Sequence, residues 1–204
     1  MYALVENNEI TQYFNYPKGF ILNDNQYSKD IFTKWTNEEL EAIGIYEIIT
    51  NNSNLKDDEY YINTNEQYSF ANGQVTKSWG TATARSLVDV NAVDDDGNAI
   101  LDEDGNQVVI EGLKTKKKKI VKQQASGLLA PTDWYVVKAS EVTSYSVPSN
   151  ITTFRANVRT KSNEMETAID NCTTVDALKT LYEYTEQEDG SITRPLGEFP
   201  KEVV

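Results

Sequence analysis

Residues 149–172 read SNITTFRANVRTKSNEMETAIDNC and contain the most regular hydrophobic spacing in the chain. Successive apolar residues lie 3, 4, 7, 4 and 3 positions apart: Ile151, Phe154, Val158, Met165, Ile169 and Cys172. This spacing places them along one side of an α-helix. We therefore predict a helix that begins near Asn150, is capped by Ser149 or Asn150, and ends near Cys172.

Residues 113–128 and 174–182 predict two further helices, the first of which carries six lysines between positions 114 and 122. The apolar stripe of the long helix then has two interpretations. It is the core of three packed helices, or, because its spacing is close to a heptad, it is a seam between copies in a homo-oligomer. Ser162 interrupts the stripe, so we favour the three-helix core.

The region before residue 113 predicts short strands and turns. Residues 1–14 predict a hairpin, residues 36–43 a short helix with a Thr36–Glu39 capping box, and residues 45–49 and 74–79 two strands. DDDGN at 94–98 recurs as DEDGN at 102–106, and Asp-Gly between apolar runs predicts hairpin turns, so we expect a three-stranded meander here. Residues 15–34 and 50–72 predict irregular structure, and residues 134–137 an extended segment.

These elements together predict an α+β protein. We expect a β-rich amino-terminal module at 1–112, a helical module of two to three helices at 113–182, and an extended tail at 183–204.

Composition argues against several classes of function. The net charge is −13, so a nucleic acid would be repelled by the chain as a whole. The chain has no histidine and one cysteine, which excludes Ser-His-Asp catalysis and an intrachain disulfide. No run of 18 apolar residues occurs, and the first residues lack the pattern of a signal peptide, so we expect no membrane association.

Two charged segments are candidates for ligand binding. An EF-hand loop with Gly97 at its sixth position would begin at Ala92, which cannot bind Ca²⁺, so we interpret the acidic repeat as solvated turns, with a weak cation site as the alternative. The lysines at 114–122 could contact nucleic acid or an anionic membrane surface, but we interpret them as a solvated helix face that pairs with the acidic hairpins or with another acidic subunit. We therefore expect no catalytic residue, no metal and no cofactor.

Two pairs of motifs resemble bacteriophage tail proteins. LLAPTDW at 128–134, followed by TFRANVR at 153–159, resembles small tail and tail-fibre assembly proteins, in which a leucine pair, Asp and Trp precede a helix with an aromatic-Arg-x-x-x-Arg element. MYALV at 1–5 and WTNEELEAIGI at 35–45 are similar to the opening of many phage tail proteins. YVVKAS at 135–140 departs from the more polar segment that a fibre-assembly chaperone would have here.

The resemblance implies a protein that binds other proteins and performs no chemistry. It implies a virion component, made in the host cytoplasm, that links a tail fibre to the tail or baseplate and contacts fibre, baseplate or tail-tube proteins. The alternative is a tail-fibre assembly chaperone that is absent from the particle. A sugar-cleaving enzyme is disfavoured, because the chain is short and has no long β-helical repeat.

Specific residues are expected to make these contacts. Trp134 is expected to fill the gap between two helices, with Phe154 facing their core and Leu128 and Leu129 closing it. Arg155 and Arg159 lie one helical turn apart and are expected to pair with carboxylates. The remaining candidates are aromatic residues expected to be available for partner contacts: Trp35, Tyr13, Phe14, Tyr16 and Phe20.

Overall fold

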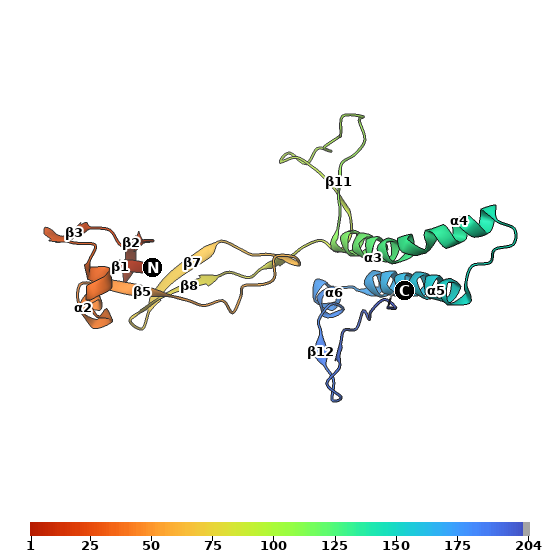
Figure 1. Cartoon of the computed structure of the whole chain (residues 1–204). Helices are drawn as coiled ribbons and strands as arrows, with labels where there is room; N and C mark the ends of the chain where they lie inside the picture. Colours follow the sequence, from red (N-terminus) through yellow and green to blue (C-terminus); the bar gives the residue numbers. More distant parts are fainter. Residues whose placement is uncertain (202–204) are drawn as a thin grey trace. The chain divides into compact units, whose positions relative to one another are not determined.

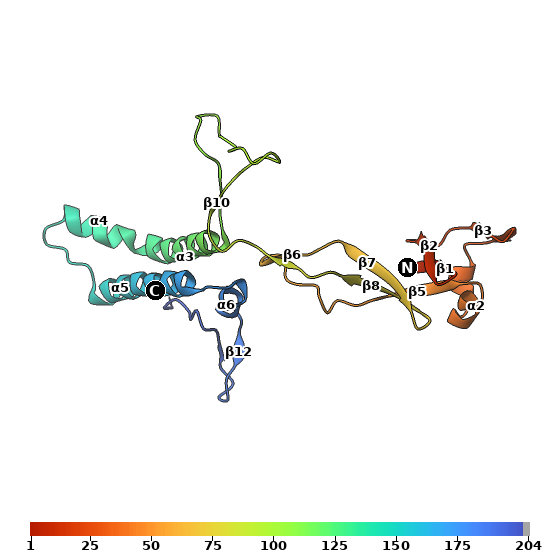
Figure 2. The same cartoon turned by 180° about the vertical axis from the view of Figure 1, so that it is seen from behind.

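A computed structural model describes residues 1–201 and divides the chain into two compact units, Met1–Thr83 and a second unit that begins at Ala84. The first unit contains a mixed five-stranded sheet with two short helices (Figure 1). The second unit contains the long helices (Figure 2). The predicted α+β class is confirmed.

The first unit is built around a sheet with the strand order β2-β1-β5-β8-β7. All its pairs are antiparallel except β5 with β8, which is parallel. The predicted amino-terminal hairpin is confirmed, and its turn residues Asn7 and Asn8 both have positive φ. The elements of this unit are β1 Tyr2–Glu6, β2 Glu9–Phe14, β3 Phe20–Leu22, β4 Asn25–Tyr27, α1 Ile31–Lys34, α2 Asn37–Glu41, β5 Ile45–Thr50, β6 Tyr61–Ile62, β7 Glu66–Ala71 and β8 Gln74–Trp79; the last strand, β9 Thr83–Ala84, ends on the first residue of the second unit.

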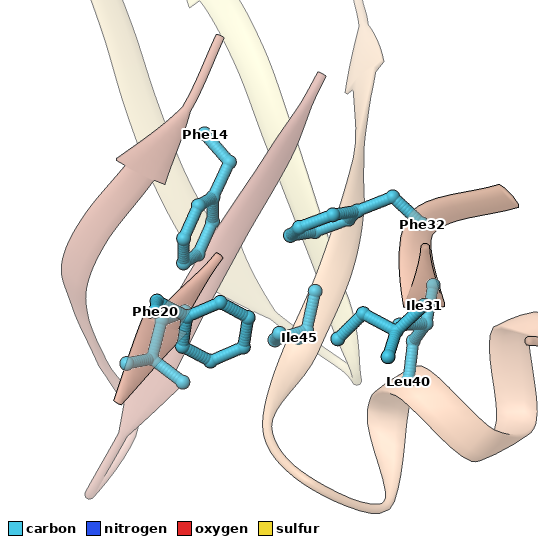
Figure 3. Packing of buried hydrophobic residues seen from close by; sticks show 7 residues of the cluster. Phe14, Phe20, Ile31, Phe32, Leu40 and Ile45 are labelled. Carbon is cyan, nitrogen blue, oxygen red and sulfur yellow. The ribbon is translucent and has the colours of Figure 1, made fainter. Parts of the chain in front are cut away.

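Each face of this sheet has its own apolar cluster, because side chains alternate along a strand. Ala3 packs in one cluster with Ile48 and Val75, while its neighbour Leu4 packs in the other. Figure 3 shows the second cluster, where aromatic and aliphatic side chains from strands and short helices meet: Phe14, Phe20, Ile31, Phe32, Leu40 and Ile45. These two clusters form the core of the unit.

The short helix α2 begins as the sequence predicts. The Thr36 hydroxyl accepts a hydrogen bond from the Glu39 amide at 3.3 Å, and the Glu39 carboxylate accepts one from the Thr36 amide at 2.8 Å. The stretches predicted to be irregular contain more structure than expected. Residues 15–34 include the β3–β4 hairpin and α1, and residues 50–72 include β6 and β7, of which β7 forms a hairpin with β8. Both hairpins close through two-residue turns with positive φ, Asn23-Asp24 and Asn72-Gly73.

The second unit is organised by two long helices that lie side by side, α3 Leu113–Leu129 and α5 Ser149–Asn171 (Figures 1 and 2). The apolar stripe predicted on the long helix is buried along its whole length, from Ile151 to Cys172. The stripe is therefore covered within the chain, as the core interpretation requires. The other elements are β10 Val90–Asn91, β11 Val109–Ile110, η1 Ala130–Thr132, α4 Asp133–Glu141, α6 Val175–Thr180, β12 Thr185–Glu186 and β13 Ile192–Thr193.

Two local predictions in this unit are wrong. The segment from Trp134 to Val137 is helical within α4 and not extended, because it continues directly from α3 through η1 and helical context overrides the strand preference of valine. The start of α5 follows Pro148, and neither Ser149 nor Asn150 caps it with a side chain. Proline fixes its own φ and ends the preceding segment without a side-chain cap.

Residues 86–112 form a projecting segment, here called the arm, that differs from the expected meander. The backbone amides of Ala92, Val108 and Ile100 donate in a closed ring: Ala92 to Val108 (2.8 Å), Val108 to Ile100 (2.9 Å) and Ile100 to Ala92 (3.0 Å). The Gln107 side-chain amide fills the centre and lies 2.8–3.1 Å from the three carbonyl oxygens. The two ends of the arm also pair, because β10 and β11 form an antiparallel ladder. The hydrogen-bonded segments of the arm therefore form a closed arrangement.

The arm belongs with the helices and not with the sheet, so the division lies at Thr83 and not near Gly112. The amides of Leu113 and Lys114 have no intrahelical acceptor at the start of α3. They donate instead to the carbonyls of Ser86 (2.9 Å) and Leu87 (3.0 Å). A Cβ at Gly112 would lie 2.3 Å from the backbone of Val88, so this close contact requires glycine.

The predicted extended tail carries the small β12–β13 hairpin and then packs on the helices. Leu196 is buried, and its amide donates to the Leu181 carbonyl at 3.0 Å. Phe199 packs against the cluster of Ala125, Phe154 and Val158. The tail therefore completes the core of the helical unit.

Candidate interaction site around Arg155

Arg155 lies at the centre of a polar cluster that joins α5 to the end of α3. Its Nη1 donates to the Leu129 carbonyl at 3.1 Å and to the Thr132 hydroxyl at 2.6 Å, and lies 2.8 Å from a carboxylate oxygen of Asp133. The residue is only 8% exposed. Hydrogen bonds from a buried guanidinium are stronger than those between neutral groups, so Arg155 fixes the path of the chain between Leu129 and Asp133.

These contacts bring together the two carboxy-terminal motifs identified in the sequence. Residues 128–134 supply the acceptors, and residues 153–159 supply the guanidinium. The expected burial of Phe154 is confirmed, as is the packing of Leu128 and Leu129 against its cluster. Thr132 also lies in the motif at 128–134, but the sequence alone did not indicate its function. Its hydroxyl also donates to the Leu129 carbonyl at 2.7 Å, which orients it for Arg155.

A groove of about 450 Å³ opens beside this cluster between α3 and α5. Its lining combines basic, polar and small residues: Lys122, Ala125, Ser126, Leu129, Asp133, Arg155, Arg159, Ser162 and Asn163. Arg159 pairs with no carboxylate within residues 1–201, and its contact is a 3.4 Å hydrogen bond to the Arg155 carbonyl. The expected carboxylate pairing is therefore seen for Arg155 and not for Arg159, whose neighbours on α5 present no acid to it.

The position of Trp134 corrects the sequence prediction. It was expected to fill the gap between helices, but it is 51% exposed and packs on Tyr135, with ring centroids 3.8 Å apart. No residue of α4 is buried, and Val136 and Val137 are also exposed. The reason is that the aliphatic side chains of Leu128 and Leu129 and the tail residue Phe199 already fill the core beside Phe154.

The amino-terminal candidates separate into surface and core. Tyr13, Tyr16 and Trp35 are exposed, and Tyr13 lies against Tyr68 with ring centroids 4.8 Å apart. Phe14 is 1% exposed and packs against Phe20, so the expectation that these two residues are available to a partner is wrong. Tyr13 and Phe14 are adjacent in strand β2, so the alternation of the strand separates them to opposite faces.

The lysines of α3 pair mainly with α5. Lys118 lies 2.8 Å from an Asp170 carboxylate oxygen, Lys122 lies 3.2 Å from Glu166, and Lys114 donates to the Asp170 carbonyl at 2.9 Å. Lys117 is buried with its Nζ 4.3 Å from the ring centroid of Tyr182. These lysines therefore hold the helical unit together, which leaves only part of the run facing solvent.

The two acidic turns of the arm have the same hydrogen bonds. One Asp94 carboxylate oxygen accepts from the Asn98 amide at 2.8 Å and the Asp96 amide at 3.0 Å, and Asp102 repeats both distances with Asn106 and Asp104. The Asn98 amide lowers the pKa of Asp94, and the Asn106 amide lowers the pKa of Asp102. Asp94 and Asp102 are thus structural parts of their turns.

Within residues 1–201, no three His, Cys, Asp or Glu side chains are grouped to hold a metal ion. Nor does any helix of that range have the length and apolar content needed to cross a membrane.

Comparisons with known proteins match no family model, no curated protein and no solved structure.

Proposed function

We propose that the chain is a non-enzymatic structural protein of a bacteriophage tail, which links a tail fibre to the tail or baseplate. The Arg155 cluster carries this proposal. Its hydrogen bonds give the residues that resemble tail proteins a shared structural role, because the first motif supplies acceptors to the arginine of the second. The resemblance is then one packing unit and not two unrelated short matches.

Exposed apolar side chains support a role in binding proteins. The arm exposes a set of large aliphatic residues: Val88, Val90, Val93, Ile100, Leu101, Val109 and Ile110. Helix α4 adds Trp134, Val136 and Val137. Monomeric proteins rarely expose so many large apolar side chains close together, and such surfaces mark interaction sites. We propose that neighbouring tail proteins cover them in the particle.

The division into two units supports a linking role. Each unit has its own apolar clusters, so each can fold and hold a neighbour without the other. The first unit offers Tyr13, Tyr16 and Trp35 at its surface, and the second offers the arm and α4. A linker between two components of a tail needs two such surfaces.

Polar substitution in the arm tests this role in the phage itself. A phage that encodes Val109→Asp together with Ile110→Asp should yield particles without attached fibres in negative-stain electron microscopy. Ile192→Asp, at an exposed position of the tail hairpin, is the matched control and should leave fibres in place. Fibres on the arm-variant particles would contradict the proposal, provided that circular dichroism shows the variant folded.

A tail-fibre assembly chaperone is the second candidate, and the same exposed apolar arm favours it, because a chaperone covers apolar surfaces of its client. Co-expression separates the two functions. A chaperone raises the amount of soluble fibre protein and is absent from finished particles, whereas the structural protein remains in them.

A further inference from the structure

The groove between α3 and α5 presents hydrogen-bond donors that lack acceptors. Arg155 uses only Nη1 for its three contacts, and within residues 1–201 its Nη2 and Nε have no hydrogen-bond partner. The Arg159 guanidinium has no carboxylate in the same range, and the Ser126 hydroxyl and Asn163 amide have no partner there either. Two guanidinium groups one helical turn apart favour a carboxylate ligand, which each can bind through two parallel hydrogen bonds.

The arm presents carboxylates that lack cations. From Ser86 to Gly112 the sequence contains no lysine or arginine. Asp94 and Asp102 are used within their turns, but the side chains of Asp95, Asp96, Glu103 and Asp104 are exposed and form no ion pair among the described residues. The ring of hydrogen bonds and the two repeated turns hold these carboxylates on a fixed backbone, so little order is lost when a partner binds them.

Apolar residues accompany both surfaces. Leu101 is exposed beside the second acidic turn, and the groove is lined by Leu129 and Ala125. The arm extends away from the groove of its own chain (Figures 1 and 2). It leaves α3 at Gly112, whereas Ser126 lies about 20 Å further along the helix. Figures 1 and 2 both show the arm on the side of α3 that faces away from α5.

We propose that the acidic arm of one copy of this chain docks in the Arg155–Arg159 groove of a second copy. Carboxylates of the Glu103–Asp104 turn bind Arg159 and the free nitrogens of Arg155, and Leu101 covers the apolar part of the groove. The net charge of −13 opposes self-association over long distances, but charges separated by more than about 8 Å are screened at physiological salt. Contact is therefore decided by the local complementarity of arm and groove. This self-association goes beyond the proposed tail function and does not depend on it.

Sedimentation analysis of the purified full chain tests the proposal. At physiological salt, the weight-average mass should rise above the 23.0 kDa of one chain as protein concentration increases, and it should return to that value at about 1 M sodium chloride, where the Debye length is about 3 Å. Arg159→Glu in the groove, or Glu103→Lys with Asp104→Lys in the arm, should each lower the association constant at least tenfold. A mixture of these two variants should associate again, because each arm then meets a groove of opposite charge.

Matched variants control for net charge. Lys116→Glu reverses an exposed lysine of α3 outside the groove, and Glu186→Lys with Glu188→Lys reverses two exposed acids in the tail hairpin, which matches the double reversal in the arm. Neither should change the association. The proposal is overturned if the wild-type chain remains monomeric at physiological salt. It is also overturned if association persists in the groove and arm variants, which would place the contact elsewhere, or if the mixed variants fail to associate while circular dichroism shows both folded.

Discussion

Removing the guanidinium of Arg155 should destabilise the helical unit more than changing any of its partners. Arg155→Ala loses two hydrogen bonds from a charged donor, each worth about 1.5 kcal/mol. The ion pair with Asp133 adds less, about 0.5 kcal/mol, because the Asp133 side chain is 59% exposed and screened by water. We expect a total loss of about 3.5 kcal/mol in the free energy of unfolding. The Thr132–Leu129 hydrogen bond can persist without Arg155 and adds no further loss.

The ranking of variants tests this reasoning more sharply than any one value. Arg155→Ala should cost most, Thr132→Val about 1–2 kcal/mol, and Asp133→Asn about 0.5 kcal/mol. Arg159→Ala is the control and should cost less than about 0.5 kcal/mol, because its side chain is exposed. Urea unfolding followed by circular dichroism at the helix band reports mainly on α3 and α5. Equal losses for Arg155→Ala and Arg159→Ala would refute the account of the cluster.

Three other perturbations have expected outcomes. Val158→Ala, at a fully buried position, should cost about 1–3 kcal/mol in the same urea assay, whereas Val137→Ala on exposed α4 should cost less than about 0.5 kcal/mol; equal costs would contradict the assigned core. Gly112→Ala should lower the free energy of unfolding by about 1–3 kcal/mol, because the new Cβ would clash with the backbone of Val88. Gly127→Ala, in open space within α3, should raise it by about 0.5–1 kcal/mol. Changes of the same sign would contradict the contact at Gly112. The Asp102 carboxylate has a lowered pKa, so it stabilises its turn at pH values above the unfolded pKa of about 3.9, and this contribution is lost as pH falls through the folded pKa. Carboxyl NMR titration of Asp102 should give a midpoint below about 3.9. A midpoint at or above about 3.9 would contradict the turn geometry.

The sequence was sufficient to predict those features that depend on residues close together along the chain. The stripe from Ile151 to Cys172 is buried because helical periodicity alone determines which side of α5 is apolar. The Thr36–Glu39 capping box and the Asn7-Asn8 turn form because they depend on residues a few positions apart. Arg155 could be identified by its place in a motif, and its Asp133 partner lies within the other motif.

Packing between elements decided several other features. Phe14 and Tyr13 are neighbours of similar type, and only the packing of Phe20 and Phe32 on one face determines which is buried. Trp134 is exposed because the tail residue Phe199 reaches the core from 65 positions further along the chain. The hydrogen-bonded ring of the arm joins the segments that contain Ala92, Ile100 and Val108. The Asp-Gly pairs predict the turns between these segments but not the ring.

Under the proposed function the chain is encoded by a phage, and quantitative mass spectrometry of purified particles of that phage tests the proposal most directly. A structural link between fibre and tail should be present at a constant copy number in every preparation, and this number should stay the same through further density-gradient purification. A chain that falls to trace amounts as the particles are purified, while tail and fibre proteins remain, would contradict the structural role.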